Sequence, residues 1–151
     1  TDLDFFKDFI KNYSIKDLPD FFIHLRPTTP IRKKKYLNDA VRLFLENHKK
    51  FTAMRSASKM SESSFKTFII KDSKLCSINN NFKLDFFNNP KNSFPNTYFP
   101  NGYIDIIKTK NILKNFIHGN KVLPYLTKGK IIDIDTLDDL QYANFIYKKN
   151  N

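Results

Sequence analysis

Apolar residues recur along this chain at two spacings, one typical of helices and the other of strands. Residues 6, 9, 10 and 13 follow the i, i+3, i+4, i+7 pattern, which predicts an amphipathic helix near the start. The same pattern predicts helices at 37–44, 109–117 and 140–147. Short runs of β-branched or aromatic residues predict strands at 21–25, 51–55, 65–70, 103–107 and 131–133. Because strands and helices alternate, we expect one α/β domain over residues 1–151.

Two carboxylates follow the apolar run at 131–132. Side chains at i and i+2 of a strand point to the same face, about 6.5 Å apart, so Asp133 and Asp135 would face one ligand together. Ligands of open α/β sheets bind beyond the carboxyl ends of strands, and Mg²⁺ takes one or two carboxylates plus substrate phosphates. The alternative is a helix start, in which Thr136 is the N-cap and the acids, including Asp139, only cap and solvate.

A rigid polar loop follows the strand predicted at 21–25. Prolines fix the backbone of the sequence Arg-Pro-Thr-Thr-Pro-Ile-Arg at 26–32, Thr28 offers a hydroxyl, and Arg26 and Arg32 offer forks for carboxylate or phosphate. Arg32 could equally hold the loop together by donating to backbone carbonyls. The position at a strand end favours a functional role for Arg26.

Residues 65–100 have a different character from the rest of the chain. The part from 86 to 100 is rich in asparagine, proline and aromatic residues and is too irregular for a helix. A long ordered loop of this kind is more often functional, or an interface, than a plain connector. Its phenylalanines would form a large exposed apolar patch unless something covers them.

Composition narrows the class of protein. No apolar run reaches transmembrane length, no signal-peptide pattern is present, and Cys76 is the only cysteine, which suits a reducing cytoplasm. The net charge of +11 raises the alternative of a basic nucleic-acid-binding module. We discount nucleic acid as a partner because the lysines are spread along the chain, apart from those at 33–35, and no nucleic-acid-binding motif is present. A membrane partner is not expected either.

Several of these segments together resemble one family, the cytidylyltransferases of the acylneuraminate (CMP-sialic acid synthetase) type. The loop at 26–32 resembles the family's Q-P-T-S-P-L-R, and residues 101–106, Asn-Gly-Tyr-Ile-Asp-Ile, are similar to its P-N-G-A-I-Y-I strand. Residues 133–136 with Asp139 resemble its D-I-D-T-x-x-D ending. Residues 55–66, from Arg55 to Lys66, look like the central region of one bacterial branch. The order and approximate spacing match over nearly the whole chain.

The resemblance implies a fold and a reaction. The fold would be a three-layer α/β/α nucleotidyltransferase (Rossmann-like) fold with a mixed sheet, present as a partial domain, with residues 65–100 forming a homodimer contact. The enzyme would transfer CMP from CTP to an acidic sugar, sialic-acid-like or a related 2-keto sugar acid, and release pyrophosphate, with Mg²⁺ neutralising charge. By resemblance Asp133 and Asp135 are the catalytic metal ligands. The substrate-binding residues are Arg26, Thr28, Arg32, Arg55, Lys66, Lys91, Asn101 and Gly102.

Departures from the family pattern leave the sugar open. The family's glycine- and lysine-rich loop, which cradles the CTP phosphates, has no counterpart here, so we expect the 151-residue chain alone to be inactive. The alternative is a non-catalytic remnant that binds a sugar nucleotide or dimerises. Lys91 stands where the family has arginine, and His118-Gly119 replaces an aromatic pair.

Some candidates also have a structural interpretation. Arg55 is either an active-site cation or part of an ion pair, Lys66 contacts ligand or lies on a solvated strand edge, and Asn101 could simply satisfy a turn. We expect His118 to be a cation at a helix carboxyl end and His24 to be a core histidine.

Overall fold

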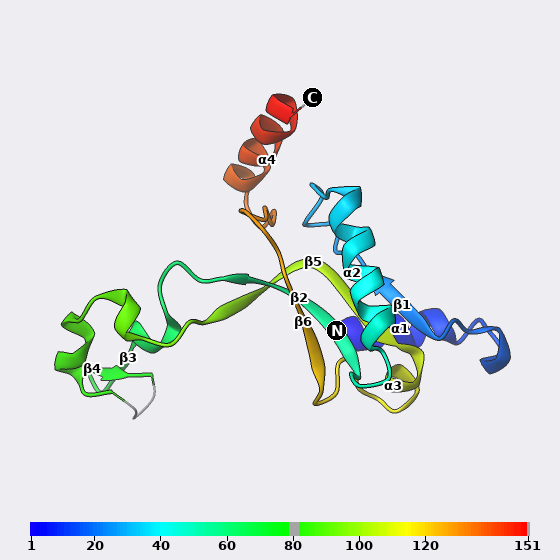
Figure 1. Cartoon of the computed structure of the whole chain (residues 1–151), viewed down its shortest axis with the longest axis horizontal. Coiled ribbons are helices and arrows are strands. Elements are labelled where there is room, and N and C mark those ends of the chain that lie inside the picture. The colour runs from blue at the N-terminus through cyan, green and yellow to red at the C-terminus, as the bar shows by residue number, and fades with distance from the viewer. Residues whose placement is uncertain (79–81, 151) are drawn as a thin grey trace. The chain divides into compact units, whose positions relative to one another are not determined.

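The computed structural model describes residues 1–78 and 82–150, and the chain divides into two compact units (Figure 1). The first unit comprises Thr1–Ala57 and Pro100–Asn151, and the second comprises Ser58–Phe99. Each unit is described by itself.

The first unit is built on a mixed sheet of four strands in the order β1-β5-β2-β6. The strands are β1 (Phe21–His24), β2 (Ala53–Lys59), β5 (Tyr98–Lys108) and β6 (Val122–Leu126). β1 pairs antiparallel with β5, and β2 pairs parallel with β6. The unit boundary falls within β2 and β5. The predicted mixed sheet is confirmed.

Helices cover both faces of this sheet. On one face α2 (Lys34–Asn47) buries Ala40 and Phe44 against Ile106 of β5. On the other face Phe6 of α1 (Asp2–Ile10) packs with Ile107 of β5 and with α3 (Thr109–Leu113). Neighbouring strand residues point to opposite faces, so Ile106 and Ile107 serve different layers. The three-layer α/β/α arrangement is therefore confirmed.

The start of α1 is fixed by a capping box. The Thr1 hydroxyl accepts from the Asp4 amide at 3.3 Å, and the Asp4 carboxylate binds back to the Thr1 backbone. Because Thr1 and Asp4 make the cap, the carboxylate of Asp2 is available for a partner elsewhere in the fold.

The strand predicted at 131–133 is wrong. Residues 130–134 carry no regular secondary structure, and the edge strand is instead β6, some residues earlier. β6 contains Pro124, which an edge strand tolerates because one side of its backbone needs no ladder partner. The apolar run still contributes to the core, since Ile132 is buried. Asp133 and Asp135 therefore do not share a strand face.

The helix predicted at 109–117 is shorter than expected, because α3 ends at Leu113. Asn115 has a left-handed φ of 64°, which ends the helical path. The Thr109 hydroxyl does not cap this helix but donates to the carbonyl of Pro19. By contrast α4 (Leu137–Asn150) agrees with the predicted last helix. Among the described residues no helix combines the length and apolar character needed to cross a membrane.

The second unit holds short elements. A 3-10 turn at Ser64–Lys66 precedes β3 (Phe68–Lys71), so the strand predicted at 65–70 starts late and Lys66 lies in a turn. β3 and β4 (Lys74–Ser77) form an antiparallel hairpin, and two further 3-10 turns cover Leu84–Asn88 and Lys91–Ser93. Asp72 and Ser73 take positive φ at the hairpin turn, as a tight turn requires.

The aromatic rings of the second unit pack largely on one another. Phe94 contacts the rings of Phe82, Phe86 and Phe87, with centroid distances of 5.2–5.8 Å, and Phe87 and Phe94 are buried. The β3–β4 hairpin nevertheless leaves Ile70 78% exposed. A homodimer contact through residues 65–100 stays a prediction.

Candidate functional site

The loop that follows β1 is held by Arg32. Its guanidinium donates to the carbonyls of Tyr103 at 2.7 Å, Arg26 at 2.8 Å and Gly102 at 3.1 Å. Burial lowers the pKa of Arg32, while Tyr103 and Asp133 oppose that shift. Because these carbonyls occupy its donors, Arg32 holds the loop against the start of β5, which was one of its two predicted roles.

The start of β5 approaches this loop closely. Gly102 has a φ of +64°, and a Cβ added there would lie 2.9 Å from Arg26 Cδ and 3.0 Å from Thr29 Oγ1. Only glycine fits both the conformation and the space. Asn101 is buried, donates from its side-chain amide to Thr127 Oγ1 at 2.7 Å and accepts from the Tyr103 amide at 3.2 Å. Asn101 therefore stabilises the turn from within.

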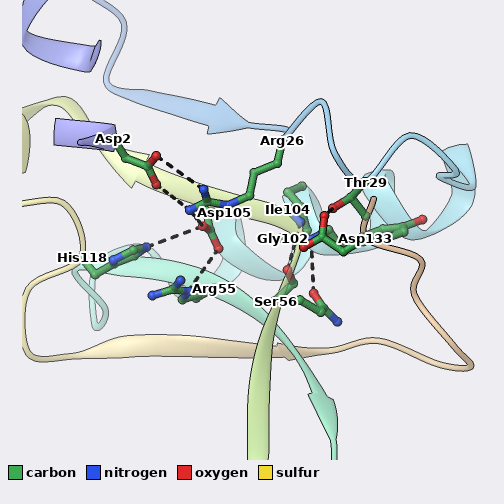
Figure 2. Close-up of polar contacts among 12 residues, drawn as sticks. Asp2, Arg26, Thr29, Arg55, Ser56, Gly102, Ile104, Asp105, His118 and Asp133 are labelled. Carbon is green, nitrogen blue, oxygen red and sulfur yellow. Dashed lines mark hydrogen bonds and ion pairs between the residues drawn. The ribbon is translucent and has the colours of Figure 1, made fainter. Parts of the chain in front are cut away.

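Thr29 connects the loop to the segment after β6 (Figure 2). Its side chain is fully buried, and its hydroxyl donates to Asp133 Oδ1 at 3.2 Å. Next to it the Ile134 amide donates to the Thr28 carbonyl at 2.8 Å. Sequence reasoning named Thr28, whose side chain is exposed, rather than Thr29. Either threonine of the pair fitted the pattern, and only burial distinguishes them.

Asp135 belongs to the start of α4. The Asp139 carboxylate accepts from the amides of Asp135 at 3.3 Å and Thr136 at 3.0 Å, and the Thr136 hydroxyl accepts from the Asp139 amide at 3.2 Å. The side-chain hydrogen bond from Thr136 lowers the pKa of Asp139. The predicted cap at Thr136 is confirmed. The side chains of Asp133 and Asp135 are both exposed.

The acidic residues would suit a metal that needs few protein ligands. In the part of the chain that the structure describes, no three histidine, cysteine, aspartate or glutamate side chains come together as a metal cage. Mg²⁺ does not need such a cage, because it keeps waters and binds substrate phosphates with one or two protein carboxylates. Asp133 and Asp135 offer exposed carboxylates of this type, and Thr29 binds one oxygen of Asp133; a Mg²⁺ site there stays a prediction.

A second polar group surrounds Asp105 on β5, with side chains from several elements directed at its carboxylate (Figure 2). Arg26 Nη2 lies 3.9 Å from Oδ2, His118 Nε2 lies 3.8 Å from Oδ2, and Arg55 Nε lies 3.9 Å from Oδ1. Asp2 of α1 completes the group through its ion pair with Arg26 at 2.5 Å. We call these five residues the Asp105 cluster.

The Asp105 cluster revises several expectations. His118 is not a cation at a helix end, because α3 ends at Leu113 and the His118 ring faces Asp105. Arg55 is an ion-pair partner, which was one of its two predicted roles. Arg26 is already bound to Asp2. Burial raises the pKa of Asp2, but the hydrogen bond and charge of Arg26 lower it by more, so it lies below the usual range.

Sequence reasoning missed Asp105, although one signal was available. An aspartate between isoleucines in the middle of an apolar strand is unusual, because a buried carboxylate is costly unless it is paired. Its partners come from distant parts of the chain and could not be predicted locally.

His24, expected in the core, is only half-buried, and the centre of its ring lies 5.3 Å from the centre of the Phe6 ring. Burial lowers its pKa.

The two predicted lysines belong to the second unit. Lys66 donates to the Asn89 carbonyl at 3.0 Å and lies 5.7 Å from the centre of the Phe94 ring. Lys91 lines a cavity of about 280 Å³ together with Lys59, Ser61 and other residues of that unit. Lys66 is therefore partly used inside the unit, whereas Lys91 is exposed.

Comparison with known proteins adds a statement about the fold. No protein-family model matches the sequence, and no curated protein sequence matches it. The structure is similar to the crystal structure of 4-diphosphocytidyl-2C-methyl-D-erythritol synthase from Anaerococcus prevotii DSM 20548, with a TM-score of 0.53 and 14% sequence identity. The match covers 97% of this chain and 77% of that chain. The chain therefore shares the α/β fold of that synthase.

Proposed function

We propose that this protein is a cytidylyltransferase that transfers CMP from CTP to an acidic sugar and releases pyrophosphate. The structurally similar protein is named 4-diphosphocytidyl-2C-methyl-D-erythritol synthase, and the cytidyl group in that name supports a cytidine nucleotide as the substrate. The acidic sugar, sialic-acid-like or a related 2-keto sugar acid, comes from the motif resemblance alone.

The observation that carries the proposal is the fixed position of Asp133. The loop after β1 buries Thr29, and Thr29 binds one oxygen of Asp133, while the carboxylate itself stays exposed. Proteins with open α/β sheets bind ligands beyond the carboxyl ends of their strands, and a preorganised carboxylate in that region can contact such a ligand. This arrangement favours a ligand role for Asp133 over a role in solvation.

Mg²⁺ would be held by Asp133 and Asp135 and, when bound, would neutralise charge on the transferring phosphate. Thr29 would keep the Asp133 carboxylate oriented. Asp139 and Thr136 would fix the backbone that carries Asp135, since their mutual bonds form the cap of α4. In this proposal Asp139 acts through position only.

By the resemblance, basic side chains would bind the acidic group of the acceptor. Arg26 is a weak candidate, because Asp2 occupies its guanidinium and Asp105 lies close to it. Lys91 lines a cavity within the second unit beside Lys59, and its part in binding the acid group rests on the motif resemblance alone. A homodimer through the exposed β3–β4 hairpin remains part of the proposal.

A second candidate is a binding protein of the same fold that does not turn over its nucleotide. The internal use of Arg26 and Arg32, two of the predicted substrate residues, favours this alternative. Both candidates bind CTP, but only the cytidylyltransferase converts it to pyrophosphate and a CMP-sugar.

The test is pyrophosphate release from the full-length protein with CTP, Mg²⁺ and a panel of sugar acids, beside calorimetric titration of CTP. We expect release that depends on both CTP and one class of sugar acid. CTP binding without release for any sugar acid would favour the binding protein. The absence of both CTP binding and pyrophosphate release would refute both candidates.

A further inference from the structure

The Asp105 carboxylate is a buried acceptor that the described residues do not satisfy. Asp105 is 3% exposed, and neither its Oδ1 nor Nε2 of His118 has a hydrogen-bond partner among them. Buried polar atoms in folded proteins almost always have a partner. Two such atoms within one cluster therefore call for a further polar group, which is either a water or a ligand hydroxyl.

The basic side chains around Asp105 do not fill this role. Arg26, Arg55 and His118 lie 3.8–3.9 Å from the carboxylate oxygens, beyond the range of a hydrogen bond. A purely structural pair would normally close to hydrogen-bond distance, as Arg26 does with Asp2 at 2.5 Å. The guanidiniums therefore pair with Asp105 by charge but make no direct hydrogen bond to it.

The charges of the cluster restrict what could bind there. Two carboxylates, Asp2 and Asp105, balance two guanidiniums, Arg26 and Arg55, so no excess positive charge attracts an anion. A ligand carboxylate cannot donate to Asp105 Oδ1, and an ammonium cannot accept from Arg55. A hydroxyl can donate to Oδ1 and accept from Arg55 Nε–H at the same time.

We infer that the Asp105 cluster is a binding subsite for a neutral hydroxyl group of the ligand, with Asp105 as acceptor and Arg55 and His118 as its neighbours. This inference rests on the proposed function only in taking the ligand to be the acceptor sugar. In this inference Asp105 is a specificity-determining residue that binds a hydroxyl of the sugar and not its acid group. The Arg55 side chain is 40% exposed, so the cluster reaches solvent on that side.

The test is a nuclear magnetic resonance titration of the full chain with two probes, glycerol for hydroxyls and sodium acetate for carboxylates, without CTP. The sequence holds only four arginines and three histidines, so the Nε–H and imidazole signals are few. Arg42, which pairs with Asp39 on α2, and the exposed His48 are controls within the same spectrum. We expect glycerol to shift Arg55 and His118 saturably, and acetate not to.

Asp105→Asn removes the charge that strengthens the hydrogen bond, so glycerol binding should weaken about tenfold. Asp39→Asn makes the same change at an exposed ion pair and should leave glycerol binding unchanged. If Asp105→Asn does not fold, His118→Ala replaces it and should weaken the glycerol-induced shift of the Arg55 Nε–H signal.

Other outcomes overturn the inference. Saturation by acetate would make the cluster an anion site, and no saturation by either probe would make it an internal ion-pair network. Because the titration contains no CTP, failure here leaves pyrophosphate release untouched. Normal glycerol binding without pyrophosphate release would instead refute only the proposed function.

Discussion

Replacing Gly102 with alanine tests the close approach between β5 and the loop after β1. The added Cβ would lie 2.9 Å from Arg26 Cδ and 3.0 Å from Thr29 Oγ1, so at least one of these side chains must move. The left-handed φ of +64° alone costs about 1–2 kcal/mol for alanine. Moving the buried Thr29, whose hydroxyl binds Asp133, adds about 1 kcal/mol.

Gly129→Ala is the matched control. Gly129 also has a positive φ, of +78°, but nothing lies within 4 Å of an added Cβ. Both substitutions change the entropy of the unfolded chain equally, so the difference between them reports the contact alone. We expect Gly102→Ala to lower the free energy of unfolding by about 1 kcal/mol more than Gly129→Ala, or about 2–4 °C in Tm.

Urea and thermal unfolding, followed by circular dichroism, measure this difference. The side-chain displacement should also disturb Asp133, so Gly102→Ala should reduce pyrophosphate release while Gly129→Ala should not. Equal free energies of unfolding for the two variants would show that the loop after β1 is not in close contact with Gly102. The account of Thr29 and Asp133 would then lose its structural basis.

Three further predictions concern the same unit. Thr29→Val removes the hydroxyl that binds Asp133 and should cost about 1 kcal/mol in urea unfolding, with a loss of turnover; unchanged stability would contradict the contact. Asp133→Asn and Asp135→Asn should each lower pyrophosphate release by orders of magnitude, and added Mg²⁺ should partly restore it. Asp139→Asn should only weaken the cap of α4, which lowers the free energy of unfolding by about 1 kcal/mol. Burial raises the pKa of Asp2, but Arg26 lowers it by more, so the pKa in the folded state lies below 3.8. The contribution of ionised Asp2 to the free energy of unfolding is therefore complete above about pH 3.8 and is lost as the pH falls through the pKa of the folded state. Acid unfolding of Asp2→Asn should therefore lack this part of the pH dependence; an unchanged acid profile would mean that the ion pair contributes nothing.

Periodic segments could be predicted from the sequence, because their packing faces are local. The apolar spacing predicted α2 and α4, and the short apolar run at 21–25 predicted β1. The run at 131–133 was misread because periodicity cannot distinguish a short strand from an irregular segment that buries one isoleucine. β6 was missed because Pro124 argues against a strand everywhere except at an edge.

The candidate site could be predicted only in part. The loop at 26–32 and Asp133 were identified from motifs, and the structure brings them together through Thr29. The Asp105 cluster joins residues from α1, the loop after β1, β2, β5 and the segment after α3. No local pattern tells which of these distant charges meet, because that depends on the strand order of the sheet.

The most direct test of the central claim is ³¹P nuclear magnetic resonance of a mixture of the full-length protein, CTP, Mg²⁺ and a sugar acid. The account predicts that the CTP signals are replaced by equal amounts of pyrophosphate and a phosphodiester of CMP with the sugar. Asp133→Asn in the same mixture should leave CTP unchanged. Formation of inorganic phosphate and CDP, or equal product formation by Asp133→Asn, would contradict it.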